Sequence, residues 1–311
     1  MKQTDRIFIA GHNGMVGSAL YRLLKEKQFN NLIVADRKKL DLLSQIETRN
    51  FFIKNNIDCL VIAAAKVGGI KANITYPADF LYNNLQIQNN LINEAVNSGV
   101  KKIIFLGSSC IYPAKCLQPM KEEYLLTGPL EPTNEGYALA KIAGLKMLEY
   151  YNLQYGLNVL SLMPCNLYGP NDSFDLEHSH VLSALMKKVV DAIDNNLNEV
   201  FIWGSGIARR EFMHVDDLAE AILFFSNKFE NHSFFNVGWG TDISIKELAL
   251  LIGKIANFKG EFIWDTTKPD GMLKKCMDVS RMQEYGFTPK INLEMGIKEM
   301  INLYNKKKII L

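Results

Sequence analysis

The stretch RIFIAGHNGMVG, residues 6–17, joins a short apolar run to a turn that contains three glycines. Residues 16–24 then place apolar side chains at helical spacing. The segment therefore predicts a β-strand, a glycine turn and an α-helix, in that order.

Glycine recurs at every third position of this turn, at Gly11, Gly14 and Gly17. This spacing lets the backbone turn tightly, approach a pyrophosphate and pack the helix against the strand. The N-terminus of the helix presents free amides to phosphates at the same place. The turn predicts a dinucleotide site, and a glycine turn without a ligand is the alternative.

A second apolar run, residues 32–35, ends at Asp36 and Arg37 about twenty residues after the turn, where a dinucleotide-binding fold reads the adenosine ribose. Asp36 suits the free ribose diol of NAD, whereas Arg37 suits the 2′-phosphate of NADP. These neighbours give opposite indications and leave the choice of dinucleotide open.

Three more apolar runs, residues 59–65, 102–106 and 159–163, are separated by helical patterns. Strands that are apolar throughout and joined by crossovers predict a parallel sheet that is covered on both faces. We therefore expect an α/β fold with a Rossmann-type doubly wound parallel sheet. Ligands bind beyond the carboxyl ends of such strands, where this chain carries glycines and polar residues.

Composition narrows the class of protein. The chain has 311 residues, 48% of them hydrophobic and 22% charged, and its formal net charge of +2 gives no basic surplus for nucleic acid. The five cysteines are odd in number and scattered, so we expect no disulfide framework, no metal site and a reducing, cytoplasmic setting. Without a leader-like segment or a membrane-length apolar run, we expect neither targeting nor membrane insertion.

Tyr137 and Lys141 lie four residues apart, so on a helix both side chains share one face. An ammonium beside a phenol favours the phenolate and lowers the pKa of the phenol. The spacing thus predicts a proton shuttle, and a Tyr and a Lys on an ordinary amphipathic helix are the alternative. Ser108 follows the fourth predicted strand, where its hydroxyl can hydrogen-bond a substrate carbonyl.

Further motifs resemble those of the extended short-chain dehydrogenase/reductases: SSCIYP at 108–113, EPTNE at 131–135, Tyr137 with Lys141, and REFMHVDD at 210–217. Within that superfamily the chain is similar to the GDP-L-fucose synthase family of GDP-4-keto-6-deoxymannose 3,5-epimerase/4-reductases. The match covers nearly the whole chain. SSC at 108–110 together with SHV at 179–181 is far more specific than the glycine turn.

The resemblance implies two sets of catalytic residues. Ser108, Tyr137 and Lys141 match the reductase triad, in which the tyrosine protonates the C4 oxygen as hydride arrives. Cys110 and His180 match the epimerisation pair, which makes chemical sense because a 4-keto group acidifies the protons at C3 and C5 and inversion needs a base and an acid. A small buried apolar residue is the alternative for Cys110, and a structural histidine is the alternative for His180.

The resemblance also implies ligand-binding residues. NADP(H) is the expected cofactor, with NADH not excluded. The cofactor-binding positions are Gly11, Asn13, Gly14, Met15, Val16, Gly17, Asp36, Arg37, Asp41, Leu42, Ala64, Lys66, Leu106, Gly107, Ser109, Tyr137, Lys141, Pro164, Asn166, Leu167 and His180. The expected partner is a GDP-linked 4-keto-6-deoxy sugar, bound by Lys188, Trp203, Arg210, Asp270 and Lys275. Trp203 as a plain core residue is the alternative to stacking on the base.

Other polar residues of the motifs are expected to be structural. We expect His12 and His214 to serve the fold, and Asp216 with Asp217 to begin a helix rather than hold a metal.

Several positions depart from the family pattern. Asn13 stands where the family has an arginine that helps hold the 2′-phosphate, Lys188 replaces a usual arginine, and Gly136 replaces a usual proline. The loop before Phe234 is also shorter than is common. These changes make NADPH preference less secure than the fold, and they leave room for a different sugar tail.

The predicted function is 3,5-epimerisation and NADPH-dependent C4 reduction that converts GDP-4-keto-6-deoxy-D-mannose to GDP-L-fucose. The same chemistry, or C4 reduction alone, on a GDP-4-keto-6-deoxy-heptose for surface polysaccharide fits the motifs as well. Dehydration is disfavoured because Ser109-Cys110 replaces the Asp-Glu pair of the 4,6-dehydratases. A 4-epimerase would show no net redox change, and a non-catalytic dinucleotide-binding regulator is the remote alternative.

We expect two lobes with the active cleft between them. A cofactor lobe spans residues 1–165 and takes back a segment near 208–240, and a smaller C-terminal α/β lobe for the sugar nucleotide spans 166–207 and 241–311. The sequence has no repeat or obvious linker, which suits lobes tied by several crossings. The resemblance also implies a homodimer packed through helices.

Overall fold

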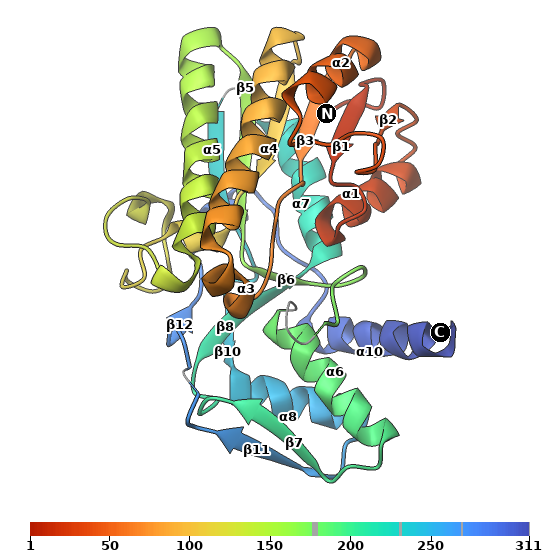
Figure 1. Ribbon diagram of the computed structural model, residues 1–311, viewed down its shortest axis with the longest axis vertical. Coiled ribbons are helices and arrows are strands. Elements are labelled where there is room, and N and C mark those ends of the chain that lie inside the picture. The colour runs from red at the N-terminus through yellow and green to blue at the C-terminus, as the bar shows by residue number, and fades with distance from the viewer. Residues whose placement is uncertain (176–179, 230–231, 269, 311) are drawn as a thin grey trace.

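A six-stranded parallel sheet forms the centre of the larger lobe (Figure 1). The computed structural model describes residues 1–175, 180–229, 232–268 and 270–310. Its strand order is β2-β1-β3-β4-β5-β9, which confirms the predicted doubly wound α/β class. The strands are β1 (Ile7–Ala10), β2 (Leu32–Ile33), β3 (Cys59–Ile62), β4 (Lys102–Leu106), β5 (Asn158–Pro164) and β9 (His232–Val237).

Helices cover both faces of this sheet. The strand order reverses between β1 and β3, so right-handed crossovers on either side of that point place their helices on opposite faces. Helices α1 (Met15–Glu26) and α7 (Val215–Lys228) pack together, and α4 (Pro77–Asn97) packs between α2 (Gln45–Asn55) and α5 (Glu135–Tyr155). The strands between these layers are buried almost throughout, as expected from their apolar composition.

The smaller lobe is built around β8 (Arg209–His214), which pairs with β6 (Asn166–Tyr168), β10 (Asp242–Ser244) and β12 (Lys274–Lys275). A second small sheet pairs β7 (Glu199–Trp203) with β11 (Glu261–Asp265). Helices α6 (Val181–Asp194), α8 (Ile245–Ala256) and α10 (Leu293–Ile310) pack beside these strands (Figure 1). The remaining short helices are α3 (Ile70–Thr75), α9 (Ser280–Glu284), η1 (Ser109–Ile111), η2 (Glu122–Tyr124) and η3 (Pro132–Asn134).

Each lobe has its own hydrophobic core, and β8 passes between them. Phe212 belongs to the core of the smaller lobe, whereas Met213 and Val215 belong to the core of the larger one. Met277 and Met282 also pack in the larger core, because α9 contacts β9. The lobes are thus tied by several crossings, and the exact boundaries given above stay predictions.

The predicted strands differ from the observed ones mainly at their ends. The run 102–106 coincides with β4, whereas 59–65 pairs only as far as Ile62. The three alanines that follow leave the sheet at the edge where parallel strands end. Helix α7 begins at Val215, which confirms the helix start predicted for Asp216 and Asp217. Among the described residues, no helix combines the length and apolar character needed to cross a bilayer.

Glu211 in β8 joins three segments that are far apart in the sequence. It is 1% exposed, and its carboxylate accepts the N–H of Gly240 at 2.7 Å and the N–H of Met277 at 2.8 Å. A Cβ on Gly238 would lie 2.1 Å from the Glu211 Oε1, so only glycine fits beside the carboxylate. Burial raises the pKa of the Glu211 carboxyl from its ordinary 4.5 to about 7.

Glu211 should make stability depend on pH. A carboxyl with a raised pKa in the folded state contributes stability that is full below the unfolded pKa and is lost as pH rises through the folded value. Between pH 5 and 8, wild-type protein should lose up to about 3 kcal/mol of unfolding free energy relative to Glu211→Gln. Chemical denaturation across this range measures the difference. The exposed Glu284→Gln should track wild type, and parallel curves for Glu211→Gln and wild type would contradict the assignment.

Candidate functional site

The glycine turn brings the ends of β1 and β3 into backbone contact. Gly11 has φ +90°, and a Cβ there would lie 2.6 Å from the backbone N of Ala64. A Cβ on Gly17 would lie 2.2 Å from the Gly11 carbonyl oxygen. Gly14 is the N-cap of α1 and offers no side-chain cap, so the first amides of α1 remain available for a phosphate.

Four neighbouring strands end at the same edge of the sheet, because β1, β3, β4 and β5 are parallel and adjacent. Beyond these ends the backbone is held closely: the Lys66 N–H donates to Asn84 Oδ1 at 2.8 Å, and the Gly107 N–H donates to the Leu162 carbonyl at 2.9 Å. The expected cofactor residues at this edge are Gly11, Asn13, Gly14, Met15, Val16, Gly17, Ala64, Lys66, Leu106, Gly107, Ser109, Pro164, Asn166 and Leu167.

The ribose-reading residues follow β2. Oδ1 of Asp36 accepts the N–H of Lys38 at 3.0 Å and the N–H of Lys39 at 3.1 Å. The carboxylate of Asp36 therefore stabilises its own turn. Asp41 similarly accepts the N–H of Leu43 at 3.1 Å, so it shapes the loop that carries Leu42.

Helix α5 carries the predicted proton shuttle. Lys141 is 4% exposed, its Nζ donates to the Leu106 carbonyl at 2.7 Å, and the same Nζ lies 5.7 Å from the centre of the Tyr137 ring. Ser108 lies close enough to the Tyr137 hydroxyl to favour the ionised phenol. The structure thus places Ser108, Tyr137 and Lys141 near one another.

The predicted direction of the Tyr137 pKa is wrong in this structure. Burial raises the pKa of the phenol well above its ordinary value, the nearby Cys110 adds to the increase, and only the Ser108 hydrogen bond opposes it. Burial also lowers the pKa of Lys141 to about 8. Desolvation outweighs the attraction expected from the spacing, because it disfavours the charged form of both groups. The phenol therefore keeps its proton at neutral pH.

Close packing of α4 on α5 explains the departure at Gly136. A Cβ at Gly136 would lie 2.8 Å from the Pro77 carbonyl oxygen, at the start of α4. Further along, the Gln88 Nε2 donates to the Ala140 carbonyl at 2.6 Å. These contacts fix the turn of α5 that carries Tyr137.

Cys110 lies just beyond β4 and is 5% exposed. Its N–H donates to Ser108 Oγ at 3.3 Å. Burial raises the pKa of the thiol, whereas the positive charge of Lys275 and the Ser108 hydrogen bond act to lower it. Lys275 lies in β12, opposite Arg210 in β8. Burial lowers the pKa of Lys275, and Cys110 is the group that most opposes this decrease.

His180 begins α6 on the other lobe. It is the N-cap residue, it is exposed, and its carbonyl accepts the N–H of Ala184 at 3.0 Å. Ser179 of the SHV motif lies outside the described residues.

The expected nucleotide-binding residues lie on strands of the smaller lobe and on α6, except Asp270, which lies in the loop before β12. Trp203 in β7 is 64% exposed, with Lys268 Nζ 5.6 Å from its ring centre. Asp270 accepts the N–H of Ser205 at 2.7 Å and its hydroxyl at 2.8 Å. Lys188 Nζ donates to the Phe201 carbonyl at 2.9 Å. An exposed indole beside a lysine ammonium is more consistent with a stacking surface than with a core residue.

Glu131 begins the EPTNE motif at residues 131–135, but the sequence alone does not assign it to the site. Its negative charge favours the charged forms of both Arg210 and Lys275. The sequence signal that could identify Glu131 as a site residue is its position in this motif, immediately before the turn that leads to α5.

A match to a known protein family agrees with the dinucleotide site expected at the glycine turn. Residues 7–238 match the model described as the NAD dependent epimerase/dehydratase family. The chain belongs to the NAD dependent epimerase/dehydratase family. Its members use a nicotinamide dinucleotide, which agrees with the glycine turn and with the edge of the sheet.

Relatives confirm the resemblance to the GDP-L-fucose synthases. GDP-L-fucose synthase 1 of Arabidopsis thaliana is 49% identical over 304 residues, which cover 98% of this chain and 94% of the relative. GDP-L-fucose synthase of Escherichia coli strain K12 is 48% identical, with 94% of each chain covered. A GDP-mannoheptose C4 reductase from Campylobacter jejuni with NADP bound has a TM-score of 0.89 at 36% identity, with 98% of this chain and 99% of that chain covered.

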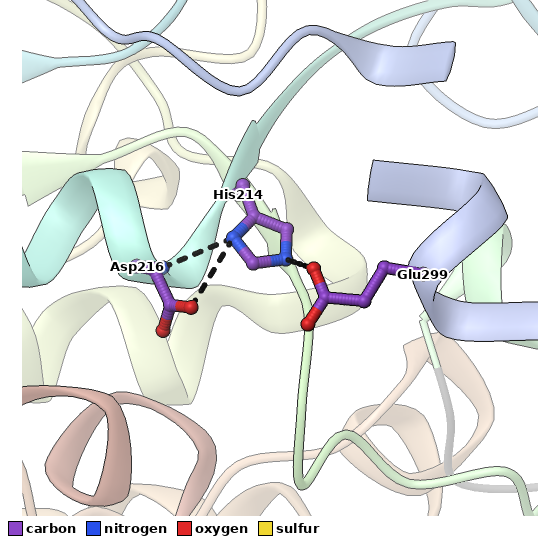
Figure 2. A group of neighbouring side chains, drawn as sticks. All are labelled: His214, Asp216 and Glu299. Atoms are coloured by element: carbon purple, nitrogen blue, oxygen red, sulfur yellow. Dashed lines mark hydrogen bonds and ion pairs between the residues drawn. The ribbon is translucent and has the colours of Figure 1, made fainter. Parts of the chain in front are cut away.

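One polar cluster in this family member lies outside the expected site. Figure 2 shows His214 between Asp216 and Glu299. His214 is fully buried; its Nδ1 accepts the N–H of Asp216 at 3.3 Å, and its Nε2 lies 3.4 Å from Glu299 Oε2. Nε2 faces the Glu299 carboxylate within ion-pair distance but without the geometry of a hydrogen bond. The cluster therefore ties β8 to α10, which fits the structural role expected of His214.

Lys275 should lower the pKa of the Cys110 thiol. Removing the ammonium in Lys275→Met should move alkylation of Cys110 to higher pH by roughly one unit, because a nearby positive charge favours the thiolate. Mass spectrometry of the Cys110 peptide after iodoacetamide pulses from pH 7 to 10.5 measures this shift. Lys274→Met is the matched control, because the neighbouring Lys274 is half-exposed and pairs with Asp242 at 3.2 Å. Equal shifts in both variants would contradict the prediction.

Proposed function

We propose that the chain is a 3,5-epimerase and NADPH-dependent C4 reductase that converts GDP-4-keto-6-deoxy-D-mannose to GDP-L-fucose. The observation that best supports this function is the position of four residues at the end of β4 and on the adjoining α5: Ser108, Cys110, Tyr137 and Lys141. This grouping occurs in a chain whose relatives are named GDP-L-fucose synthases.

Reduction at C4 requires a proton as well as a hydride. NADPH, when bound, supplies the hydride. We assign Ser108 to the sugar carbonyl oxygen and Tyr137 to the proton that this oxygen takes up. The phenol of Tyr137 holds a proton that it can give when the substrate arrives, although burial makes it a weaker acid. Lys141 is fixed at the Leu106 carbonyl, below the phenol ring.

Epimerisation uses different atoms. The 4-keto group acidifies the C–H bonds at C3 and C5, so a base can remove each proton and an acid can return one to the opposite face. We assign these roles to Cys110 and His180, which come from different lobes. Each inverted carbon therefore acquires a hydrogen from solvent, and in D₂O it acquires deuterium.

The turn after β2 supports NADPH over NADH. Oδ1 of the Asp36 carboxylate accepts the amides of Lys38 and Lys39, which ties this oxygen to its own turn. Arg37, Lys38 and Lys39 then gather positive charge at the place where a 2′-phosphate would lie. These cations compensate for Asn13, which replaces the arginine of the family. Five free cysteines suit the reducing cytoplasm in which we place the enzyme.

A GDP-4-keto-6-deoxyheptose is the second candidate substrate. The Campylobacter jejuni structure that resembles this chain is named a GDP-mannoheptose C4 reductase. The catalytic residues proposed here act on C3 to C5, so none of them reads the group attached to C5. One extra hydroxymethylene changes binding by only about 1 to 3 kcal/mol.

The function is tested by offering both keto sugars with NADPH or NADH in D₂O. We expect the hexose and NADPH to give the higher kcat/KM, with deuterium at both C3 and C5 of the product. A tenfold preference for the heptose would reverse the ranking of substrates. A product without deuterium at either carbon would identify a plain C4 reductase.

Two variants should separate the half-reactions. Tyr137→Phe should lose about 10² to 10⁴-fold in reduction while keeping exchange at C3 and C5, because the phenol acts at C4. Cys110→Ser should lose exchange while still catalysing NADP⁺ reduction by GDP-L-fucose, which requires no epimerisation. Mass spectrometry measures exchange, and absorbance at the NADPH band measures redox turnover. A Tyr137→Phe enzyme that reduces at the wild-type rate would refute the assignment of the donor.

We also propose that the protein is a homodimer packed through α4 and α5. Large apolar side chains are exposed on these helices: Tyr82 is 64%, Tyr150 61% and Leu153 74% exposed. An apolar face of this kind marks an interface, and a two-fold axis would pair it with itself.

Leu153→Glu should dissociate the dimer, because it places a charge in the apolar interface. Sedimentation at micromolar concentration should show dimers for wild type and monomers for this variant. Ile46→Glu is the matched control, because Ile46 is 72% exposed on α2, away from the proposed face. Monomeric wild-type protein, or a dimeric Leu153→Glu variant, would contradict the proposal.

A further inference from the structure

We propose that Asp172 and Ser183 form a positioning pair that holds His180 in place for epimerisation. The inference rests on the proposed function, and it concerns residues outside the catalytic and ligand-binding sets assigned above. Its basis is a buried contact between the loop after β6 and the first turn of α6.

The contact joins two polar side chains that are almost completely buried. Ser183 is 0% exposed and Asp172 is 8% exposed. The Ser183 hydroxyl donates to Oδ2 of Asp172, and Oδ1 of the same carboxylate accepts the N–H of Ser173 at 2.8 Å. Burying a carboxylate and a hydroxyl is costly unless they are hydrogen-bonded to partners, so this pair fixes the relative positions of the loop and the helix.

His180 depends on that helix end for its position. It is exposed, it is the N-cap of α6, and its side chain forms no capping hydrogen bond. Its backbone is held by the bond from the Ala184 N–H to its carbonyl. Ser183 lies in this same first turn, so its bond to Asp172 anchors the turn that presents the imidazole.

The loop that supplies Asp172 is itself fixed to the cofactor side of the molecule. The Asp172 N–H donates to the Gly169 carbonyl at 3.1 Å, directly after β6. The neighbouring Asn171 Nδ2 donates to Ser18 Oγ at 2.9 Å, and Ser18 lies in α1, the helix that follows the glycine turn. The pair therefore connects the start of α6 to α1, the helix that follows the glycine turn. This connection sets the position of His180 relative to the proposed dinucleotide site.

The test compares Ser183→Ala, Asp172→Asn and the double variant in three assays. Deuterium exchange at C3 and C5 in D₂O reports the epimerisation step. The initial rate of NADP⁺ reduction by GDP-L-fucose reports the redox step without epimerisation. Quenching of protein fluorescence by NADPH reports the cofactor site. Ser226→Ala is the matched control, because Ser226 is also buried and its hydroxyl donates to the Leu223 carbonyl within α7.

We expect each single variant to lose exchange by roughly 10- to 100-fold, because a displacement of about 1 Å can cost that much in a reacting pair. NADP⁺ reduction and NADPH affinity should stay within about threefold of wild type, and the double variant should lose little more than either single one, because both changes break one interaction. Ser226→Ala should exchange like wild type.

Equal losses of exchange and of NADP⁺ reduction in the single variants would overturn the proposal, since they would indicate a general structural role. Additive losses in the double variant, or undiminished exchange in Ser183→Ala, would also overturn it. Failure of wild-type protein to exchange deuterium at all would instead refute the proposed epimerase function.

Discussion

The hydrogen bond from the Lys141 ammonium to the Leu106 carbonyl is the contact on which the site depends. It is 2.7 Å long and almost fully buried. A buried ammonium is costly unless it has a partner, so this bond holds α5 against the carboxyl end of β4. Ser108 and Cys110 continue from that strand, and Tyr137 lies one turn earlier on the helix. One contact therefore sets the separation between the two groups of reactive side chains.

Burial at this contact also shifts the pKa values of Tyr137 and Lys141. The phenol of Tyr137 keeps its proton because desolvation outweighs the nearby ammonium, and the same effect weakens the hold of Lys141 on its own proton. The protonated phenol can supply a proton during ketone reduction, although its raised pKa makes it a weaker acid. Binding of the proposed dinucleotide and sugar nucleotide would add charges, chiefly the phosphates, that favour the charged form of Lys141.

The sequence predicted the features that depend on local patterns. The apolar run 102–106 matches β4 without error, and the glycine spacing identifies the turn after β1, because strand periodicity and backbone freedom are properties of consecutive residues. Features that depend on distant segments were not predictable. The carboxylate of Glu211 meets Gly240 and Met277 only in the fold. Likewise, the spacing of Tyr137 and Lys141 reveals that they are neighbours but not that they are desolvated, which is why the predicted pKa direction was wrong.

The two proposed half-reactions draw differently on the architecture. Ser108, Tyr137 and Lys141 belong to one lobe, so hydride chemistry depends on positions within a single packed core. Epimerisation instead needs Cys110 from that lobe and His180 from α6 of the other, so it depends on how the lobes are held together. Substitutions that shift the smaller lobe by a fraction of an ångström would weaken inversion at C3 and C5 before they affected reduction at C4. A fold of this kind can therefore support both an epimerase/reductase and a C4 reductase, because Ser108, Tyr137 and Lys141 all lie in one lobe, whereas Cys110 and His180 come from two.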